Sequence, residues 1–308
     1  MGPMTDPVLP RLILDGGLGT RLADRGNDIS GSLWSAQILR DNPDEVTAAH
    51  RDFFDAGADV ATTCSYEVTT DGLLAAGVAA SEADDLADSL LRQSVRLAVA
   101  AAEQCGTDAL IAASVGPYGA GPGRGTEYDG DYGLTTAQLA AWHRRRVDIL
   151  ADTEADVLLA ETVPSIREVE ALAGELDRAG TPALLSVTVK PGSDGVLSDG
   201  TDVREVAAIA SSSSAIRAVG VNCGSVGDVL AGARRLAEHT DLPLIAYPNS
   251  GERWDHAHRV WVPRQNDGGP GLLESVPDFL EAGVRLLGGC CRVTPREIAA
   301  VRDRALAY

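Results

Sequence analysis

The chain has 308 residues and a mass of 32.0 kDa, enough for one large domain with a single hydrophobic core. Its formal net charge of −19 would repel a phosphate backbone, so no nucleic-acid partner is expected. No run approaches the ~18 consecutive apolar residues of a membrane-spanning helix. The first thirty residues lack the basic start and following apolar stretch of a secretion signal. We therefore expect a cytoplasmic protein that does not enter a membrane.

Short β-branched or aliphatic runs alternate with helix-like stretches along residues 11–308. This alternation predicts a parallel sheet, and several runs are apolar throughout, as in strands buried on both faces. We predict eight strands, at residues 11–15, 58–64, 109–115, 156–161, 183–190, 216–223, 243–248 and 285–290. This number favours a single (β/α)8 TIM-type barrel over an open doubly wound sheet. Residues 1–10 are expected to precede the barrel as a tail, in which residues 1–3 resemble a cloning remnant.

Helical patterns lie between these runs, at residues 44–56, 83–103, 136–152, 165–179 and 295–307. Start signals are expected at Thr136, at Ser165 followed by Glu168, and at Thr294 followed by Pro295 and Glu297. Gly57, Gly180 and Gly283 stand where helix ends favour glycine. Two long connections, residues 116–134 and 249–271, break the rhythm and are expected to be functional lids or rims.

Five cysteines in a chain without a secretion signal make a disulfide framework improbable and point to metal binding or catalysis. Cys223 ends the sixth predicted strand, and Cys290 and Cys291 end the eighth. Active sites of barrels lie at these carboxyl ends, so three thiols there predict a zinc site whose fourth position is free for a substrate. Adjacent strand residues point to opposite faces, so Cys290 and Cys291 can share an ion only if the backbone leaves strand geometry. The preceding Gly288-Gly289 would permit that departure.

The other metal-binding residue types are interpreted differently. Cys105 ends a predicted helix and is expected to be an ordinary small core residue, while the role of Cys64 near the second strand end stays open. His256 and His258 lie in a polar connection and are expected to be solvated. No histidine ends a predicted strand, which argues against a metallohydrolase barrel.

Three motifs are specific enough to compare with known families: RLLGGCCR at 285–292, VNC at 221–223 and YPNSGE at 247–252. They resemble the homocysteine S-methyltransferase family, most closely its short bacterial and plant branch that uses S-methylmethionine. Shorter matches cover nearly the whole chain, with DGG at 15–17, SLWSA at 32–36, SY at 65–66, SVGPYG at 114–119, ET at 161–162 and SDG at 198–200. Two residues depart from the family pattern: Glu67 stands where glutamine is usual, and Cys64 is an unusual neighbour.

The resemblance implies a zinc-dependent homocysteine S-methyltransferase, in which the zinc-bound thiolate of L-homocysteine takes a methyl group from S-methylmethionine, or from S-adenosylmethionine, to form methionine. It implies that Asp15 and Glu161 hold the substrate ammonium and that N–H groups around Gly16 and Gly17 bind its carboxylate. Further candidate substrate contacts are Trp34, Ser65, Tyr66, Asn222, Tyr247 and Asn249.

The chemistry suits these residues, because a free thiol with a pKa of ~8.5 is mostly protonated at neutral pH, whereas zinc binds it as thiolate. Attack on a sulfonium donor destroys charge and is therefore favoured where water is excluded. Two alternatives stay open: a betaine-dependent or other thiol or selenol methyltransferase of the same family, and a non-catalytic zinc-binding or thiol-binding barrel. The preferred donor and the oligomeric state are not determined by the sequence.

Overall fold

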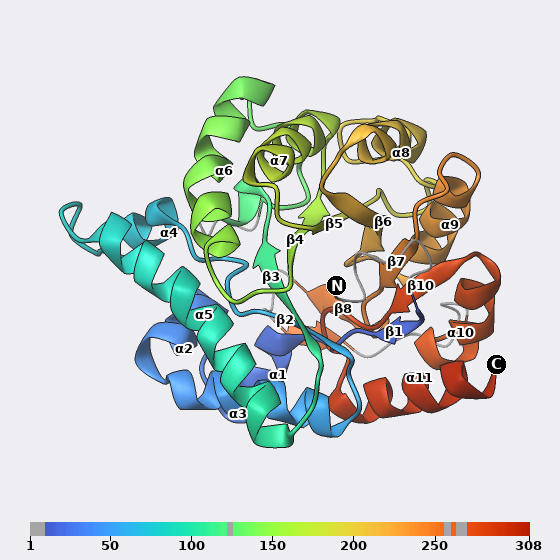
Figure 1. Cartoon of the computed structure of the whole chain (residues 1–308), viewed down its shortest axis with the longest axis horizontal. Coiled ribbons are helices and arrows are strands. Elements are labelled where there is room, and N and C mark those ends of the chain that lie inside the picture. The colour runs from blue at the N-terminus through green and yellow to red at the C-terminus, as the bar shows by residue number, and fades with distance from the viewer. Residues whose placement is uncertain (1–9, 122–125, 256–259, 263–269) are drawn as a thin grey trace.

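The barrel closes through hydrogen bonds between its first strand and its second. The computed structural model describes residues 10–121, 126–255, 260–262 and 270–308. Within these ranges eight strands form one parallel sheet in the order β1-β10-β7-β6-β5-β4-β3-β2. A parallel bridge between Leu14 and Val60 joins the two ends of that order, and the Asp15 N–H donates to the Val60 oxygen at 3.0 Å. Figure 1 shows the strands at the centre of a ring of helices, which confirms the predicted (β/α)8 barrel.

All eight predicted strands are present, and most are shorter than predicted because their last residues leave the ladder and enter the loops above the barrel. They are β1 (Leu12–Ile13), β2 (Val60–Thr62), β3 (Leu110–Val115), β4 (Val157–Val163), β5 (Ala183–Val187), β6 (Ile216–Asn222), β7 (Leu244–Tyr247) and β10 (Val284–Leu287). Asp15, Cys223 and Cys290 are among the residues that follow a strand. An antiparallel pair that was not predicted, β8 (Arg253–Asp255) and β9 (Val260–Val262), lies in the connection after β7.

The five predicted helices are present, and each end agrees to within two residues. The helices are α1 (Leu18–Asp24), α2 (Ser35–Asp41), α3 (Pro43–Asp55), α4 (Thr70–Ala75), α5 (Ala83–Cys105), α6 (Thr136–Ala151), α7 (Ile166–Ala179), α8 (Val203–Ser212), α9 (Val226–Ala237), α10 (Leu272–Glu281) and α11 (Pro295–Ala307), with a 3-10 turn, η2 (Tyr118–Ala120). In the described part of the chain, no helix combines the length and the apolar character needed to cross a membrane.

The helix caps agree with the sequence in part. Thr294 caps α11 in the predicted capping box. At α6 the capping residue is Thr135, so the prediction of Thr136 is wrong by one residue. Ser165 stands at the N-cap of α7 but makes no side-chain cap bond, because Asp199 accepts the first N–H of that helix instead. Glycine follows three helices at positive φ, as predicted, at Gly57 (+88°), Gly180 (+74°) and Gly283 (+89°).

Buried apolar side chains form two layers, one between the strands and the helices and one inside the barrel. Successive strand residues point to opposite faces, so each strand contributes to both layers. The interior layer consists of Leu14, Val60, Ala112, Val157, Leu159, Leu184, Ala218, Ile245, Tyr247 and Leu286. Cys290 packs against this layer, so the functional face lies directly above a filled barrel.

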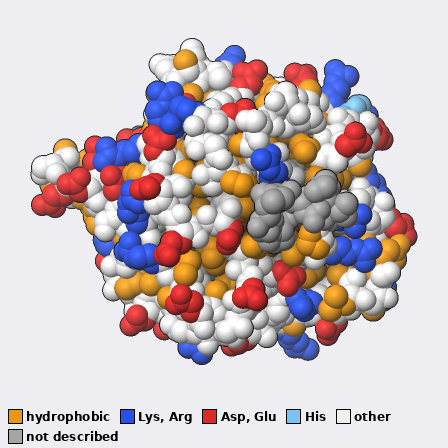
Figure 2. Space-filling model, in the orientation of Figure 1, with side chains coloured by type: hydrophobic (Ala, Val, Ile, Leu, Met, Phe, Trp, Pro, Cys, Tyr) orange, Lys and Arg blue, Asp and Glu red, His pale blue; other side chains and the backbone are white. Residues whose placement is uncertain are grey.

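The space-filling view has acidic and basic side chains interspersed over this face of the molecule (Figure 2). Three sequence predictions cannot be compared with the structure, because they concern residues outside the described ranges. These are the N-terminal tail up to residue 9 and the solvated histidines His256 and His258.

Candidate metal centre

Three cysteines predicted at strand ends lie together at the carboxyl end of the barrel. The Sγ atoms of Cys223, Cys290 and Cys291 all lie within 4.8 Å of one another, and those of Cys223 and Cys291 are 3.9 Å apart. Cys223 follows β6 directly, and the adjacent pair follows β10 in the same sheet. A tetrahedral zinc with Zn–S bonds of about 2.3 Å places its sulfur ligands about 3.8 Å apart. The spacing of the three sulfurs therefore fits one shared ion.

The two glycines before the cysteine pair serve a different purpose from the one predicted. Neither Gly288 nor Gly289 has a positive φ, so conformational freedom is not what the turn requires. A Cβ at Gly288 would lie 2.7 Å from the Leu14 Cβ, and one at Gly289 would lie 2.2 Å from Val293 Cγ1. Glycine is needed because the backbone passes too close to its neighbours for any side chain. A left-handed backbone conformation is found instead at Cys223, where φ is +55°.

The loop after β7 fixes the cysteine turn through hydrogen bonds. The Cys291 N–H donates to Asn249 Oδ1 at 3.1 Å, so Asn249, a candidate substrate contact, holds the metal centre itself. Arg292 follows with φ of +66° and donates from Nε to Glu252 Oε2 at 2.6 Å. These contacts hold the turn that carries Cys290 and Cys291 against the loop after β7, the strand that pairs with β10.

Two acids predicted to hold an ammonium are buried at the same end of the barrel. Asp15 is 2% exposed, and its carboxylate accepts the Thr62 N–H at 2.8 Å and the Thr62 hydroxyl at 3.0 Å. Glu161 is 6% exposed and accepts the Ser114 hydroxyl. Neither carboxylate forms an ion pair within the described residues. A cationic ligand would therefore be favoured here, because it would neutralise charge that the protein leaves uncompensated.

Burial changes the protonation of both acids. It raises the pKa of Asp15 to about 8, against the hydrogen bonds from Thr62, and the charge of Glu161 raises it further. Burial likewise raises the pKa of Glu161 to about 7, against the hydrogen bond from Ser114. Both carboxyls are thus easily protonated without a ligand, and an ammonium placed between them would favour their charged forms.

The glycines after Asp15 are close-packed. A Cβ at Gly16 would lie 2.3 Å from the Val293 oxygen, and one at Gly17 would lie 2.7 Å from the Cys290 oxygen. The Gly17 N–H already donates to the Val293 oxygen at 3.1 Å. This N–H is therefore used within the protein, whereas carboxylate binding by the N–H groups around Gly16 and Gly17 stays a prediction. Glycine at position 17 lets the first strand approach the cysteine turn.

Asn222, a candidate substrate contact, also holds three strand ends together. It is fully buried, and its Oδ1 accepts the Thr162 N–H at 3.0 Å and the Ser186 hydroxyl at 2.8 Å. Its Nδ2 donates to the Thr162 hydroxyl at 2.8 Å. Thr162, which follows Glu161, is held at φ of +60°. Asn222 thus ties the ends of β4, β5 and β6 together and fixes the backbone beside the acid.

This network predicts a graded loss of stability. Asn222→Ala removes three buried hydrogen bonds and leaves their partners unsatisfied, so we expect a loss of about 3 kcal/mol in the free energy of unfolding. The matched variant Ser186→Ala removes one of them and should cost about 1 kcal/mol. Urea denaturation of both variants measures the difference. Equal stabilities for the two variants would contradict the network.

The remaining candidates differ in how they could reach a substrate. Ser65 is buried and donates its hydroxyl proton to the Ser114 oxygen at 2.7 Å, and its contact with a substrate stays a prediction. Tyr247 is 3% exposed and belongs to the interior layer of the barrel. The Tyr66 ring packs beside Gly116, and the Trp34 ring lies against Gly19. Both aromatic rings are half-buried, so they stay candidates for contact with a substrate.

Comparison with known proteins decides the family. The sequence matches the family profile described as Homocysteine S-methyltransferase over residues 12–305. The chain belongs to the homocysteine S-methyltransferase family. It is 40% identical to the Homocysteine S-methyltransferase of Escherichia coli (strain K12), over 96% of this chain and 95% of that protein. It is also 37% identical to the Selenocysteine Se-methyltransferase of Brassica oleracea var. italica, over 96% of this chain and 89% of the relative.

Solved structures from the homocysteine S-methyltransferase family agree with the fold. The metallated form of the homocysteine methyltransferase MmuM from Escherichia coli superposes with a TM-score of 0.83 at 37% identity, covering 98% of this chain and 100% of that one. The apo form of the same protein gives a TM-score of 0.76 at 34% identity, again over 98% and 100% of the two chains. The resemblance seen in the motifs is therefore confirmed along the whole barrel.

The two departures from the homocysteine S-methyltransferase pattern differ in burial, because Cys64 is buried whereas Glu67 is half-buried. Cys64 is 2% exposed, its thiol donates to the Ser35 oxygen at 3.6 Å, and burial raises its pKa to about 12, so it is an unreactive core thiol. Burial raises the pKa of Glu67 well above its usual range. Cys105 ends α5 before β3 begins, at the opposite end of the barrel from the sulfur cluster.

Three side chains in contact with the site were not singled out from the sequence. Thr62 binds Asp15, and Ser114 binds Glu161. Tyr128, in the connection predicted to be a lid, places its hydroxyl 2.9 Å from the Cys223 sulfur. Ser114 belongs to a motif shared with the family, and Tyr128 lies in the connection predicted to be a lid. The sequence therefore indicated both regions, but not the individual contacts.

Proposed function

We propose that the chain is a zinc-dependent methyltransferase that moves a methyl group from S-methylmethionine to L-homocysteine and forms methionine. The main support is the placement of three cysteine sulfurs, all within 4.8 Å, at the same barrel end as two buried acids without an ion-pair partner among the described residues. The name of the Escherichia coli relative and the family membership support homocysteine as the acceptor.

Three thiolates form a soft donor set that favours zinc over harder ions. Zinc held by Cys223, Cys290 and Cys291 would supply one open position that favours the thiolate form of a substrate thiol. In the described residues, the cluster includes no fourth cysteine, histidine or carboxylate ligand, which supports a catalytic site over a closed structural one. The relative solved in a metallated form supports a metal in this fold.

The acceptor would be oriented by its two ends. Its ammonium would lie between Asp15 and Glu161, which bind it by charge and also fix the direction of the side chain. Its thiol would then point toward the three cysteines, which follow β6 and β10 in the same sheet. Two buried acids and a sulfur cluster at one end of the barrel favour an amino acid that carries a thiol.

The methyl transfer balances with no further reactant. The acceptor sulfur attacks the methyl carbon, a new sulfur–carbon bond forms, and the bond from that carbon to the donor sulfonium breaks. The bonding electron pair stays on the donor sulfur, which becomes a neutral thioether. One homocysteine and one S-methylmethionine thus yield two methionines and one proton, which comes from the homocysteine thiol. The step destroys charge, so the apolar barrel interior beneath the site and the loop that carries Tyr128 favour it by limiting water.

The donor prediction is that S-methylmethionine is used far better than betaine, with S-adenosylmethionine intermediate or poor. Both sulfonium donors carry an amino-acid ammonium, but the adenosyl group is bulky, whereas betaine holds its methyl groups on a less reactive nitrogen. Catalytic efficiency with each donor at fixed homocysteine measures the order. A clear preference for betaine would overturn the donor assignment while leaving the thiol acceptor in place.

A selenol is a second candidate acceptor, favoured by the 37% identical Brassica relative named Selenocysteine Se-methyltransferase. A selenol ionises more readily than a thiol and needs less activation. Adding selenocysteine to the same assay as a competitor of homocysteine measures the relative preference. We expect homocysteine to be preferred, because the relative named for it is the more similar at 40% identity.

A further inference from the structure

We infer that Tyr128 is a positioning residue of the metal centre, whose hydroxyl donates a hydrogen bond to the Cys223 sulfur. The inference rests on the proposed zinc site. The two atoms lie 2.9 Å apart, and either could donate in a metal-free protein. A cysteine that ligates a metal is a thiolate without a proton, so in the loaded protein the tyrosine hydroxyl must be the donor.

The chain on both sides of Tyr128 is held in place. On one side, Thr126 accepts the Tyr132 hydroxyl at 3.2 Å, and its own hydroxyl donates to the Gly119 oxygen at 3.1 Å. On the other side, Gly130 passes so close to the loop after β4 that a Cβ there would lie 3.0 Å from the Pro164 oxygen. The hydroxyl of Tyr128 is therefore directed at the sulfur by a folded loop.

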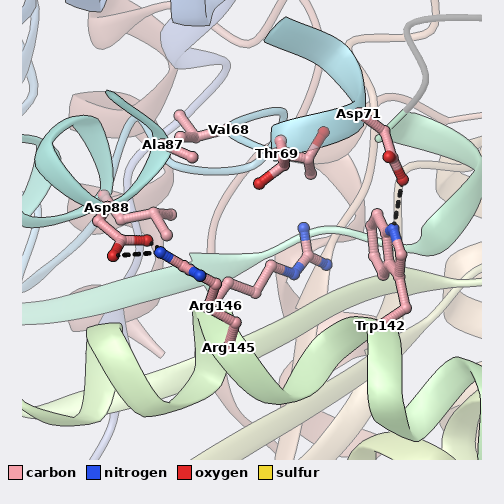
Figure 3. Close-up of a pocket in the computed structure, with 10 residues that line it drawn as sticks. Val68, Thr69, Asp71, Ala87, Asp88, Trp142, Arg145 and Arg146 are labelled. Carbon is pink, nitrogen blue, oxygen red and sulfur yellow. Dashed lines mark hydrogen bonds and ion pairs between the residues drawn. The ribbon is translucent and has the colours of Figure 1, made fainter. Parts of the chain in front are cut away.

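The start of this loop rests on a buried polar chain from α6 and α7. Arg146 is 5% exposed, donates to the Gly116 oxygen and lies 4.6 Å from the centre of the Trp142 ring (Figure 3). His143 and Glu168 are fully buried and 2.8 Å apart.

Glu168 also accepts the Tyr118 N–H at 2.6 Å, and the rings of Tyr118 and Tyr132 pack 5.1 Å apart. Helices on the outside of the barrel thus support the loop that reaches the sulfur cluster. Figure 3 also shows Trp142 bound through its ring N–H to Asp71, which joins α6 to α4 at 2.7 Å.

A hydrogen bond to a ligating sulfur stabilises its anionic form and withdraws electron density from it. Contacts of this kind around a metal typically change metal affinity or activity by about 10- to 100-fold when removed. The Tyr128 residue is 43% exposed, so changing its hydroxyl does not open the core. Its effect can therefore be measured in a folded protein.

The test compares Tyr128→Phe, which removes only the hydroxyl, with Tyr128→Ala, which also removes the ring. Zinc affinity is measured by competition with a chromophoric chelator, and the cobalt-substituted proteins report the energy of the sulfur-to-cobalt charge-transfer band. We expect both variants to bind zinc about 10-fold more weakly than the unaltered protein and to shift the band alike. Tyr308→Phe is the matched control, because its exposed hydroxyl binds Glu281 at the surface, and it should change neither quantity.

The outcomes separate the inference from the proposed function. If Tyr128→Phe binds zinc and absorbs as the unaltered protein does, the inference is overturned, whether or not Tyr128→Ala differs, while the zinc site stands. If the unaltered protein binds neither zinc nor cobalt, the metal site and the inference fail together.

Discussion

Serine in place of any one of Cys223, Cys290 and Cys291 is expected to remove zinc and abolish methionine formation. The three sulfurs lie within 4.8 Å of one another. Among the described residues, no other cysteine, histidine or carboxylate belongs to this cluster. A serine hydroxyl stays protonated at neutral pH and is a poor zinc ligand. Losing one of three thiolates should weaken zinc binding by roughly 3 to 5 kcal/mol, on the order of 10²- to 10⁴-fold.

Metal analysis of the purified variants measures this loss, and Cys105→Ser is the matched control. Cys105 lies at the end of α5, on the side of the barrel away from the sulfurs, so its replacement should leave zinc content and activity unchanged. Full zinc retention in any two of the three cluster variants would contradict the assignment of the ligands.

Asp15→Asn and Glu161→Gln are expected to weaken homocysteine binding without removing zinc. Each variant keeps the size of the side chain and its ability to accept a hydrogen bond, from Thr62 or Ser114, but loses the charge that an ammonium would meet. A charge-assisted contact contributes roughly 1.5 to 3 kcal/mol, so the homocysteine KM should rise about 10- to 100-fold. Steady-state kinetics at saturating donor measure the change, and unchanged kinetics in both variants would refute the proposed ammonium site.

The same two variants should stabilise the ligand-free protein at alkaline pH. The folded pKa values, about 8 for Asp15 and about 7 for Glu161, lie above the ordinary carboxyl range near 4. The folded state therefore binds more protons than the unfolded state in this window, and stability falls as the pH rises from about 4 to about 8. The neutral variants lack this loss. Their unfolding temperatures should exceed that of the parent protein at pH 8 and approach it near pH 4. A lower unfolding temperature of the variants at pH 8 would contradict the burial of two carboxylates without an ion-pair partner.

Much of the fold could be predicted because its signals are local. A strand buried on both faces is a continuous apolar run, and this pattern located all eight barrel strands. The carboxyl ends of the strands share one face, so the order of Cys223, Cys290 and Cys291 along the chain was sufficient to predict their meeting.

The parts that were missed depend on contacts between residues far apart in the chain. The need for glycine at Gly289 comes from the Val293 side chain, and the partner of the Gly17 N–H is the Val293 oxygen. Asn222 belongs to a strand-end motif and resembled a binding residue, but the partners that occupy its amide lie on β4 and β5. Tyr128 reaches Cys223 across 95 positions, which no local pattern indicates.

The most direct test of the account is methionine formation from homocysteine and S-methylmethionine labelled in both sulfonium methyl groups. The zinc-loaded protein is compared with the same protein after chelation and after zinc is restored. We expect two methionines for each homocysteine consumed, each with one labelled methyl group, with the activity lost on chelation and regained with zinc. Equal rates with and without the metal, or breakdown of the donor with no homocysteine consumed, would contradict it.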